Sequence, residues 1–419
     1  MSISSGPSSV PTGIQRRLTY VLFTAQSIIG AGQILSFTFL PIVATMLTGS
    51  ESYAGVPATL TMLGRALAAY PIGWLMDKIG RRMGLSLGYF ISVVGALFCV
   101  AAINQGAFLL LCLGALLNGV SRSSGEQARF AAAEIMPPER RAKAIGLIVF
   151  AGTVGALATP FITEPAGTFA EYAGLLRSAG PYLMAAALSL IAGLIIFVLL
   201  RPDPKEIGLA IAGQQPHHQH GGEARPLRQI FAVPAVYVAT IVLVVSQLVM
   251  TLIMVITPLH MHHFNHPDTN ITLALTAHTL GMFGLSNLTG WLIDRTSRHM
   301  MIIVGALVLA ISAVITPLSP DLVPLALALF LLGLGWNFCF IAGSSLLSDA
   351  LAPNERGRAQ GANEMLVALA AGTGSLSSGS VFAQGGIVAV SIMGLVVSLA
   401  LAVIAAWALR RQEKVAVAG

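Results

Sequence analysis

The sequence has little charge and little cysteine, and these two shortages exclude several classes of protein. Only 10% of its 419 residues are charged, whereas soluble proteins carry about 25%. Its cysteines, Cys99, Cys112 and Cys339, all lie in apolar segments, so we expect neither a disulfide framework nor a thiolate metal site. The sequence contains no G-x-x-x-x-G-K-[ST] phosphate loop, catalytic triad or cofactor motif, so it predicts neither a nucleotide-driven pump nor an enzyme with a bound cofactor.

Apolar sequence is abundant. Hydrophobic residues make up 55% of the chain, and the mean hydropathy is +0.81. A helix that crosses a bilayer needs about 20 such residues. The chain divides into twelve segments of this kind, at 19–46, 53–77, 83–103, 107–133, 142–164, 179–200, 234–258, 270–293, 300–318, 322–349, 361–384 and 387–410. The sequence therefore predicts an all-α membrane protein with twelve transmembrane helices. The first segment is too long for a signal peptide.

The distribution of Lys and Arg predicts how the chain crosses the membrane. With the N-terminus in the cytoplasm, 19 of the 23 basic residues fall at the termini or in cytoplasmic loops, and only Arg177 falls in an outer loop. The positive-inside rule then places both termini in the cytoplasm. We expect the protein to lie in a plasma membrane, namely the bacterial inner membrane. Anionic lipid accounts for the net charge of +6, so no nucleic-acid partner is expected.

Two sequence elements recur at about half the length of the chain. Residues 73–82 read GWLMDKIGRR and residues 290–299 read GWLIDRTSRH, an offset of 217; residues 134–146 and 349–361 are related by an offset of 215. Such duplication predicts two parallel six-helix repeats. The expected domains are 1–200 and 234–419, joined by a Pro- and Gly-rich cytoplasmic linker at 201–233.

The first repeated element resembles the loop between helices 2 and 3 of the major facilitator superfamily, roughly G-x-L-x-D-x-x-G-R-R. The matching positions are Gly73, Leu75, Asp77, Gly80, Arg81 and Arg82. In the second copy, Ser297 replaces the second glycine and His299 the last arginine. The resemblance implies a secondary transporter that works by alternating access.

The second element, Glu134-x-x-Pro137-x-x-x-Arg141, is similar to the cytoplasmic end of helix 4 in sugar porters. There, ion pairs close the inner gate. The resemblance implies one gate set in each half of the chain. The members are, in the N-terminal half, Asp77, Arg81, Glu134 and Arg141, and in the C-terminal half, Asp294, Arg298, Asp349 and Arg356. Ion pairs that form in one state and break in the other provide a bistable element; the alternative is that these charges only set topology.

Arg65 lies near the middle of the second predicted segment, and Arg122, Glu126 and Arg129 lie in the inner half of the fourth. A charge in mid-bilayer costs on the order of 3 kcal/mol, so these side chains are expected to face a cavity or one another. The spacings i, i+4 and i, i+3 allow Glu126 to contact Arg122 and Arg129, and Arg65 is a third possible partner. We expect Glu126 to carry protons; the alternative is a structural ion cluster.

The resemblance also implies a central cavity lined by helices 1, 4, 7 and 10. The polar residues on these helices are Gln26, Gln33, Asn118, Gln127, Gln247, Thr251, Trp336 and Asn337. Each is a candidate substrate contact, with helix packing as the alternative. His278, in the eighth segment, could titrate or pack.

Two departures weaken the resemblance to proton-coupled drug exporters. Many exporters carry an Arg four residues before a Gly in helix 4, but here Ala115 precedes Gly119 at that spacing. The Gly-Pro pair typical of helix 5 in exporters is also missing, since the fifth segment has Gly152, Gly155 and a later Pro160.

Histidines form two clusters, His217, His218 and His220 in the linker and His260, His262, His263 and His266 after the seventh segment. Imidazoles at such spacing can bind zinc, nickel or copper, but no nearby cysteine or carboxylate cluster completes a site. Histidine-rich loops are also often merely polar.

Four functions remain open. Proton-driven efflux of a small organic compound is the first, and proton-coupled uptake of a metabolite the second. Transition-metal transport and a non-transporting receptor are the others; charges within the membrane argue against a receptor. The expected partners are a small-molecule substrate, protons and the lipid bilayer, and the chain is expected to act as a monomer.

Overall fold

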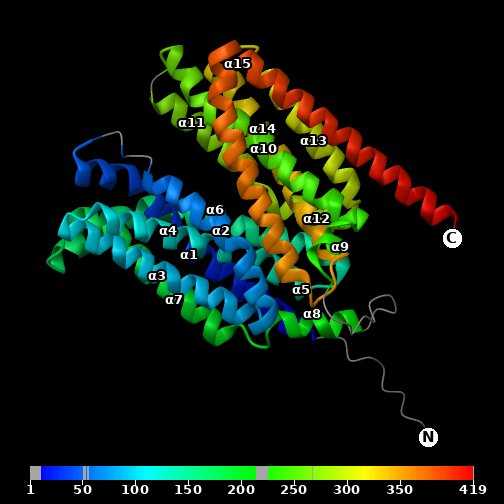
Figure 1. The fold of residues 1–419 in the computed structure, drawn as a ribbon, viewed down its shortest axis with the longest axis horizontal. Helices are drawn as coiled ribbons and strands as arrows, with labels where there is room; N and C mark the ends of the chain where they lie inside the picture. The colour runs from blue at the N-terminus through cyan, green and yellow to red at the C-terminus, as the bar shows by residue number, and fades with distance from the viewer. Residues whose placement is uncertain (1–10, 51–52, 54–55, 214–224, 267, 419) are drawn as a thin grey trace, which may run out of the picture. The chain divides into compact units, whose positions relative to one another are not determined.

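The computed structural model describes residues 11–50, 53, 56–213, 225–266 and 268–418. Within these ranges all regular structure is helical and no strand occurs (Figure 1). The contacts divide the chain into two compact units. Unit 1 comprises Met1–Pro137, Ala151–Pro226 and Leu351–Met365, and unit 2 comprises Pro138–Phe150, Leu227–Ala350 and Leu366–Gly419.

Unit 1 is built mainly from the N-terminal half of the chain. Its complete helices are α1 (Thr12–Thr48), α2 (Val56–Ile79), α3 (Arg81–Gln105), α4 (Phe108–Glu126), α5 (Ala128–Glu134), α7 (Gly180–Leu199) and α8 (Pro204–Gly213). Helices α2 and α4 approach closely, because a Cβ atom on Gly119 would lie only 2.0 Å from the carbonyl oxygen of Thr61. Such small residues let membrane helices pack backbone to backbone.

Unit 2 is built mainly from the C-terminal half. Its complete helices are α9 (Leu227–Phe231), α10 (Pro234–His263), α11 (Asp268–Thr279), α12 (Ser286–Arg295), α13 (Arg298–Ile315) and α14 (Leu322–Ala350). A single π-helical turn at Leu280–Gly284 joins α11 to α12. Turns of this type often lie at functional positions.

Two long helices contribute to both units. The first turns of α6 (Arg141–Tyr172) belong to unit 2, and the rest belongs to unit 1. The first turns of α15 (Arg356–Ala418) belong to unit 1, and the rest belongs to unit 2. The duplicated halves thus exchange the N-terminal ends of equivalent helices.

The predicted twelve-helix fold is confirmed. Nine of the described helices are long and apolar enough to cross a membrane by themselves. One of them, α15, contains two predicted spans, which meet at Gly385 and Gly386, where the backbone leaves the helical conformation. Helix α2, and α11 with α12, supply the remaining two spans.

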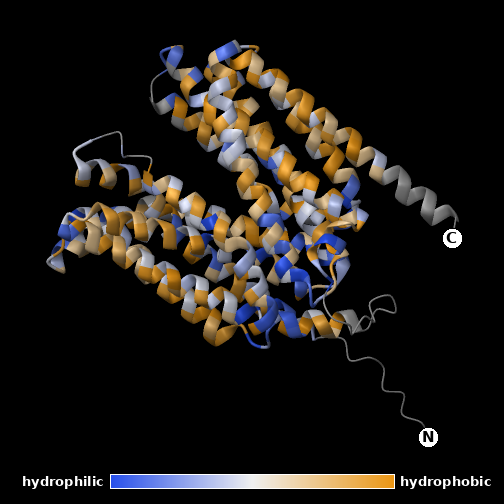
Figure 2. Cartoon of the chain, viewed as in Figure 1, coloured by the Kyte–Doolittle hydropathy of each residue, from blue (hydrophilic) through white to orange (hydrophobic). Residues whose placement is uncertain are grey.

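Exposed apolar side chains cover the outer faces of the helices. Examples are Leu109 on α4, Leu157 and Phe161 on α6, and Leu376 on α15. Figure 2 shows that hydrophobic residues run along most of the helices, with hydrophilic residues gathered near α8 and at the helix ends. A bilayer is the solvent for which such a surface is suited.

Two short helices, α8 and α9, lie in the described parts of the predicted 201–233 linker. His217, His218 and His220 lie outside the described residues.

Candidate functional site

The membrane charge cluster forms around Glu126, at the C-terminal end of α4. The Arg65 Nε on α2 donates to the Glu126 carboxylate at 2.9 Å, and the Arg122 Nε lies 3.6 Å from its other oxygen. The Glu126 side chain is 20% exposed, and that of Arg122 is 38% exposed. The predicted contacts of Glu126 with Arg65 and Arg122 are therefore present, and the cluster is partly open to its surroundings.

The predicted side-chain pair between Glu126 and Arg129 is not present. The Arg129 guanidinium donates to the backbone carbonyl of Glu126 (2.9 Å) and pairs with the Glu364 carboxylate on α15. The buried Glu364 carboxylate takes this guanidinium instead. The i, i+3 spacing allowed a contact with the Glu126 side chain but did not require it.

The predicted polar residues of α1 and α4 mostly contact other helices. The Tyr89 hydroxyl on α3 donates to the Gln26 side-chain oxygen at 3.0 Å. Gln33 lies nearby, since a Cβ atom on Gly125 would contact both glutamines. The Asn118 side-chain oxygen accepts from the Ser92 hydroxyl at 3.2 Å. Asn118 thus helps to pack α3 against α4, whereas Gln26 and Gln33 form a small polar group beside α4.

Unit 2 holds a second polar group, on α10 and α14. The Trp336 indole N–H donates to the Gln247 side-chain oxygen at 3.1 Å, and the Gln247 amide donates to Thr251 at 3.1 Å. Trp336 stacks on Phe340, with ring centroids 4.4 Å apart, and Phe283 from the π-helical turn meets Trp336 edge to face. This arrangement places amide and aromatic groups together.

Two other predicted site residues of unit 2 hold helices together. Asn337 donates to the Met282 carbonyl (2.6 Å) and to the Ser286 hydroxyl (2.7 Å), which fixes the π-helical turn against α14. His278 is buried, and its Nδ1 lies 2.9 Å from the Leu329 carbonyl oxygen. Both contacts are those of packing residues.

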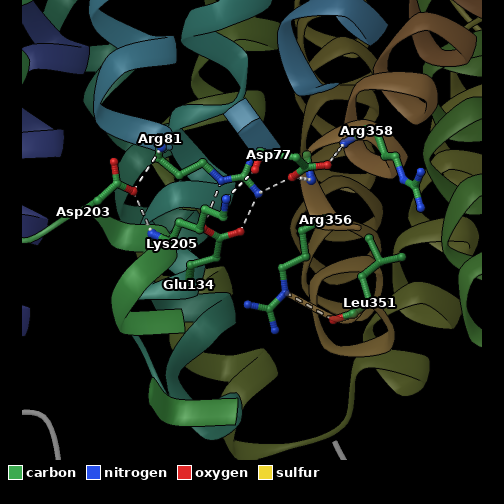
Figure 3. Close-up of polar contacts among 9 residues, drawn as sticks. Asp77, Arg81, Glu134, Asp203, Lys205, Leu351, Arg356 and Arg358 are labelled. Carbon is green, nitrogen blue, oxygen red and sulfur yellow. Dashed lines mark hydrogen bonds and ion pairs between the residues drawn. The ribbon is translucent and has the colours of Figure 1, made fainter. Parts of the chain in front are cut away.

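The Asp77 carboxylate, at the end of α2, caps the N-terminus of α15. The backbone N–H groups of Gly357 and Arg358 donate to its two oxygens at 2.6 and 2.8 Å (Figure 3). A helix N-terminus has unpaired N–H groups and a partial positive charge, so it favours a carboxylate. Gly73 lies one helical turn earlier, and a Cβ atom there would lie 2.0 Å from the Gly357 carbonyl oxygen. The glycine therefore permits the close approach that the aspartate uses.

The Arg81 guanidinium, at the start of α3, pairs with Glu134 at the end of α5. Its Nε donates to one carboxylate oxygen at 3.0 Å, and Figure 3 shows the two side chains turned toward each other. Both side chains are buried, with exposures of 1% and 3%. A pair this deeply buried is costly to break from one side, because the remaining charge has no solvent.

The turn before α3 depends on Gly80 and Asp203. Gly80 has φ +90°, a conformation that favours glycine, and a Cβ atom there would lie 2.4 Å from the Asp203 carboxylate. That carboxylate accepts from the backbone N–H groups of Arg81 and Arg82, each at 3.0 Å. The Arg82 side chain lies over the Phe197 ring of α7. Arg82 thus faces α7 and not the other predicted gate residues.

Unit 2 repeats the aspartate cap at the second copy of the motif. The Ala142 and Lys143 N–H groups, at the start of α6, donate to the Asp294 carboxylate at 3.1 and 2.8 Å. Burial raises the pKa of Asp294 above its ordinary value, and these N–H groups and Arg298 oppose the rise. The duplicated motif therefore performs the same task in both units.

The remaining ion pairs of unit 2 centre on Asp349, at the end of α14. One carboxylate oxygen accepts from Arg141 and the other from Arg298, each at 2.6 Å. Arg141 was assigned to the set of the N-terminal half, and that grouping is wrong. The reason is that Arg141 starts α6, whose first turns belong to unit 2.

Arg356 takes the corresponding exchanged position in unit 1. Its Nε donates to the Leu351 carbonyl at 3.2 Å, and a Cβ atom on Gly208 of α8 would contact both its guanidinium and Glu134. Figure 3 shows the Arg356 side chain near Glu134 and α8. Its place in the sequence predicted that Arg356 would lie with Asp294, Arg298 and Asp349. The structure places it with the first gate set instead.

Several residues of these networks were not among the candidate site residues. Glu364 lies inside a predicted span, so the argument that singled out Glu126 applied to it as well. Asp203 and the Arg225–Glu355 pair lie in loops, and the hydrogen bond to Glu355 raises the pKa of Arg225. Asp203 lies between Pro202 and Pro204, and this was the signal in the sequence that could have drawn attention to it.

The described residues contain no group of three or more His, Cys, Asp or Glu side chains arranged to hold a metal ion. His260 and His263 pack against the Phe382 ring, and the His266 Nε2 lies 2.7 Å from the Pro320 carbonyl oxygen. These three histidines therefore have aromatic and backbone partners.

Comparisons with known proteins agree with this architecture. The chain is 33% identical over 407 residues to the uncharacterized MFS-type transporter YddS of Bacillus subtilis (strain 168), covering 96% of this chain and 93% of that protein. It is 30% identical over 377 residues to the riboflavin transporter RfnT of Brucella anthropi, covering 88% of this chain and 90% of that protein. The fucose:proton symporter FucP of E. coli has the same fold, with a TM-score of 0.74 in its outward conformation, 17% identity, and coverage of 94% and 98% of the two chains.

A family model matches both halves, at residues 22–251 and 239–418. Together with twelve helices, two capped repeats and buried charges within the membrane segments, this match identifies the class of the protein. The chain belongs to the Major Facilitator Superfamily and is a multi-pass secondary transporter, not an enzyme.

Proposed function

We propose that this transporter couples proton movement to the movement of a small organic compound by alternating access. The direction of transport that we propose first is efflux. The observation that carries the proposal is the Arg65–Glu126 pair, at 2.9 Å, within predicted membrane helices. Charges are expensive there and are retained for a function. A carboxylate with two cationic partners can exchange them for a proton.

In this proposal Glu126 is the main proton-binding group. Arg65 and Arg122 are the partners of its carboxylate while the cluster is closed. When substrate or helix movement removes an arginine, protonation becomes more favourable. Glu364, paired with Arg129, is a second carboxylate that can follow the same cycle. The proposed substrate contacts are Gln26, Gln33, Gln247 and Trp336, with Asn118, Asn337 and His278 supporting them through packing.

We further propose that the gate consists of the helix caps and the buried ion pairs. The caps at Asp77 and Asp294, with Gly73 and Gly80, would form in one state and release in the other. The same holds for the pairs of Arg81 with Glu134 and of Arg141 and Arg298 with Asp349, with Arg82 and Arg356 as supports. A bistable set of this kind needs only a few kcal/mol between its states.

The proposed domains are 1–200 and 234–419, each a six-helix bundle, joined by 201–233. Both termini and the linker are proposed to be cytoplasmic, because the loop cations collect on that side. The bacterial sources of the relatives support the bacterial inner membrane as the location. We propose that a single chain carries out the cycle.

A second candidate function is proton-coupled uptake of a metabolite, and two observations favour a planar heterocycle as its substrate. One relative at 30% identity is a riboflavin transporter. In unit 2, the stacked rings of Trp336 and Phe340 lie beside the Gln247 amide. Aromatic faces and amides are suited to stack on and hydrogen-bond such rings.

The test is transport by the purified protein in proteoliposomes under an imposed pH gradient. Riboflavin and a panel of small organic compounds are measured in both directions, so efflux, uptake and an inert protein give different results. Glu126→Gln keeps the size of the side chain and one acceptor oxygen for Arg65, but removes the charge and the exchangeable proton site. We expect gradient-driven accumulation to fall toward the level without a gradient, while substrate exchange survives.

The matched control is Glu139→Gln, which removes one carboxylate at an exposed position. It should leave both activities unchanged. If the Glu126→Gln protein still couples the gradient to net transport at wild-type efficiency, Glu126 is structural. Gradient coupling would then have to reside in Glu364, or the protein is a uniporter.

A further inference from the structure

A basic cavity lies where α2 ends and α3 begins. It has a volume of about 490 Å³, and residues 201–209 form its other wall. Six charged residues line it: Lys78, Arg82, Arg201, Asp203, Lys205 and Glu206. Cations therefore outnumber carboxylates by four to two.

The carboxylate of Asp203 does not offset the cavity cations fully. It already accepts three backbone N–H groups, from Arg81, Arg82 and Lys205, at 2.9 to 3.0 Å. The Lys205 ammonium is also engaged, because it donates to the Asp77 carbonyl. Lys78, Arg82 and Arg201 are then the cations for which an anion in the cavity is the natural partner, with Glu206 at the exposed rim.

Two of these cations lie on exposed aromatic rings. The Lys78 ammonium is 3.9 Å from the centroid of the Trp74 ring, and the Arg82 guanidinium is 5.6 Å from that of Phe197. Trp74 and Phe197 are 42% and 37% exposed. Exposed aromatic rings beside cations are typical of the level at which a membrane protein meets lipid head groups.

A second cavity also has α3 in its wall, together with α7 and α6, and is apolar. It has a volume of about 270 Å³, and its walls include Val93 and Leu97 of α3, Ala187 and Leu190 of α7, and Phe169 of α6. Eleven residues of α3 separate Arg82 from Val93, a rise of about 16 Å. That distance is about half the thickness of the hydrocarbon core, so an acyl chain whose head group lies at Arg82 reaches the apolar cavity.

From this arrangement we infer that α3 and α7 bind one anionic phospholipid. The phosphate lies in the basic cavity against Lys78, Arg82 and Arg201, and an acyl chain lies in the apolar cavity. Basic pockets at membrane helix ends bind anionic head groups. A soluble phosphate compound accounts for the first cavity alone, whereas a lipid accounts for both. This inference does not depend on the substrate or on proton coupling.

The test measures lipid binding to the full-length protein in detergent by native mass spectrometry. The probes are phosphatidylglycerol, phosphatidylcholine with the same acyl chains, and inorganic phosphate. We expect phosphatidylglycerol to bind more tightly than phosphatidylcholine, and inorganic phosphate to compete poorly. Lys78→Gln with Arg201→Gln should weaken phosphatidylglycerol binding roughly 30-fold.

The charge-matched control is Arg140→Gln with Lys143→Gln, at exposed positions that do not line the cavity. It should retain wild-type binding. Ala187→Trp fills the apolar cavity and should weaken lipid binding, while Val94→Trp, on an exposed position of α3 that does not line it, should not. Equal losses in both charge pairs, or equal binding of the two lipids, overturn the inference. Full competition by inorganic phosphate, with no effect of Ala187→Trp, assigns the basic cavity to a soluble anion instead.

Discussion

The guanidinium of Arg129 on α5 pairs with the carboxylate of Glu364 on α15, although 235 positions separate the two residues in the chain. The side chains are only 4% and 2% exposed. Arg129 also donates to the backbone carbonyl of Glu126 at 2.9 Å, so it connects the buried Glu364 carboxylate to the end of α4 within unit 1. Substitutions at Arg129 and Glu364 therefore test how much this pair contributes to the stability of unit 1.

Glu364→Gln should destabilise the protein, because it leaves the Arg129 charge buried without its anion. Breaking such a pair from one side costs about 3–5 kcal/mol. Thermal unfolding in detergent is the measurement. Adding Arg129→Gln should restore part of the loss, since neither charge then remains. Additive losses in the double variant would show that the two residues do not interact.

Asp77→Asn should slow transport more than it weakens substrate binding, because Asp77 caps α15 and contacts no predicted substrate group. The amide keeps the size of the side chain but loses the charge and one of the two acceptor oxygens of the cap, at a cost of about 1 kcal/mol. Transport rate and substrate affinity are measured separately. Asp294→Asn, at the equivalent cap of α6, should behave in the same way. A proportional loss of substrate binding in the Asp77 variant would place Asp77 in the binding site.

Gly73→Ala should impair transport and lower stability by about 1–3 kcal/mol, because the added methyl group would overlap the Gly357 carbonyl oxygen. Gly372→Ala is the matched control, since nothing lies within 4 Å of a Cβ atom at that helical position. It should be neutral or slightly stabilising. Equal effects of the two substitutions would mean that close approach at Gly73 is unimportant.

The proposed topology predicts that Gln229 in α9 and Tyr172 at the end of α6 lie on opposite sides of the membrane. Both positions are exposed, and the three native cysteines are buried, so single cysteines introduced there can be labelled selectively. A membrane-impermeant maleimide should label Tyr172→Cys in intact cells but label Gln229→Cys only after permeabilisation. Labelling of Gln229→Cys from outside would reverse the orientation.

The sequence by itself determined the elements of this protein. Twelve apolar segments are each long enough to cross a bilayer, and this property is local and needs no knowledge of neighbours. The duplicated loops at 73–82 and 290–299 indicated the family, because a short sequence motif is also a local property of the chain. Arg65, Arg122 and Glu126 were also recognisable in advance, because a charge within an apolar segment is costly wherever that segment packs.

Only the tertiary structure decided which charges pair. Arg141 joins Asp349, and Arg356 lies beside Glu134, because the first turns of α6 and α15 are exchanged between the two units. Arg129 pairs with Glu364, 235 positions along the chain, and a helical spacing rule cannot foresee a partner on another helix. Ion pairing depends on distances of a few ångströms between side chains far apart in the chain, and such distances are set by packing and not by sequence order.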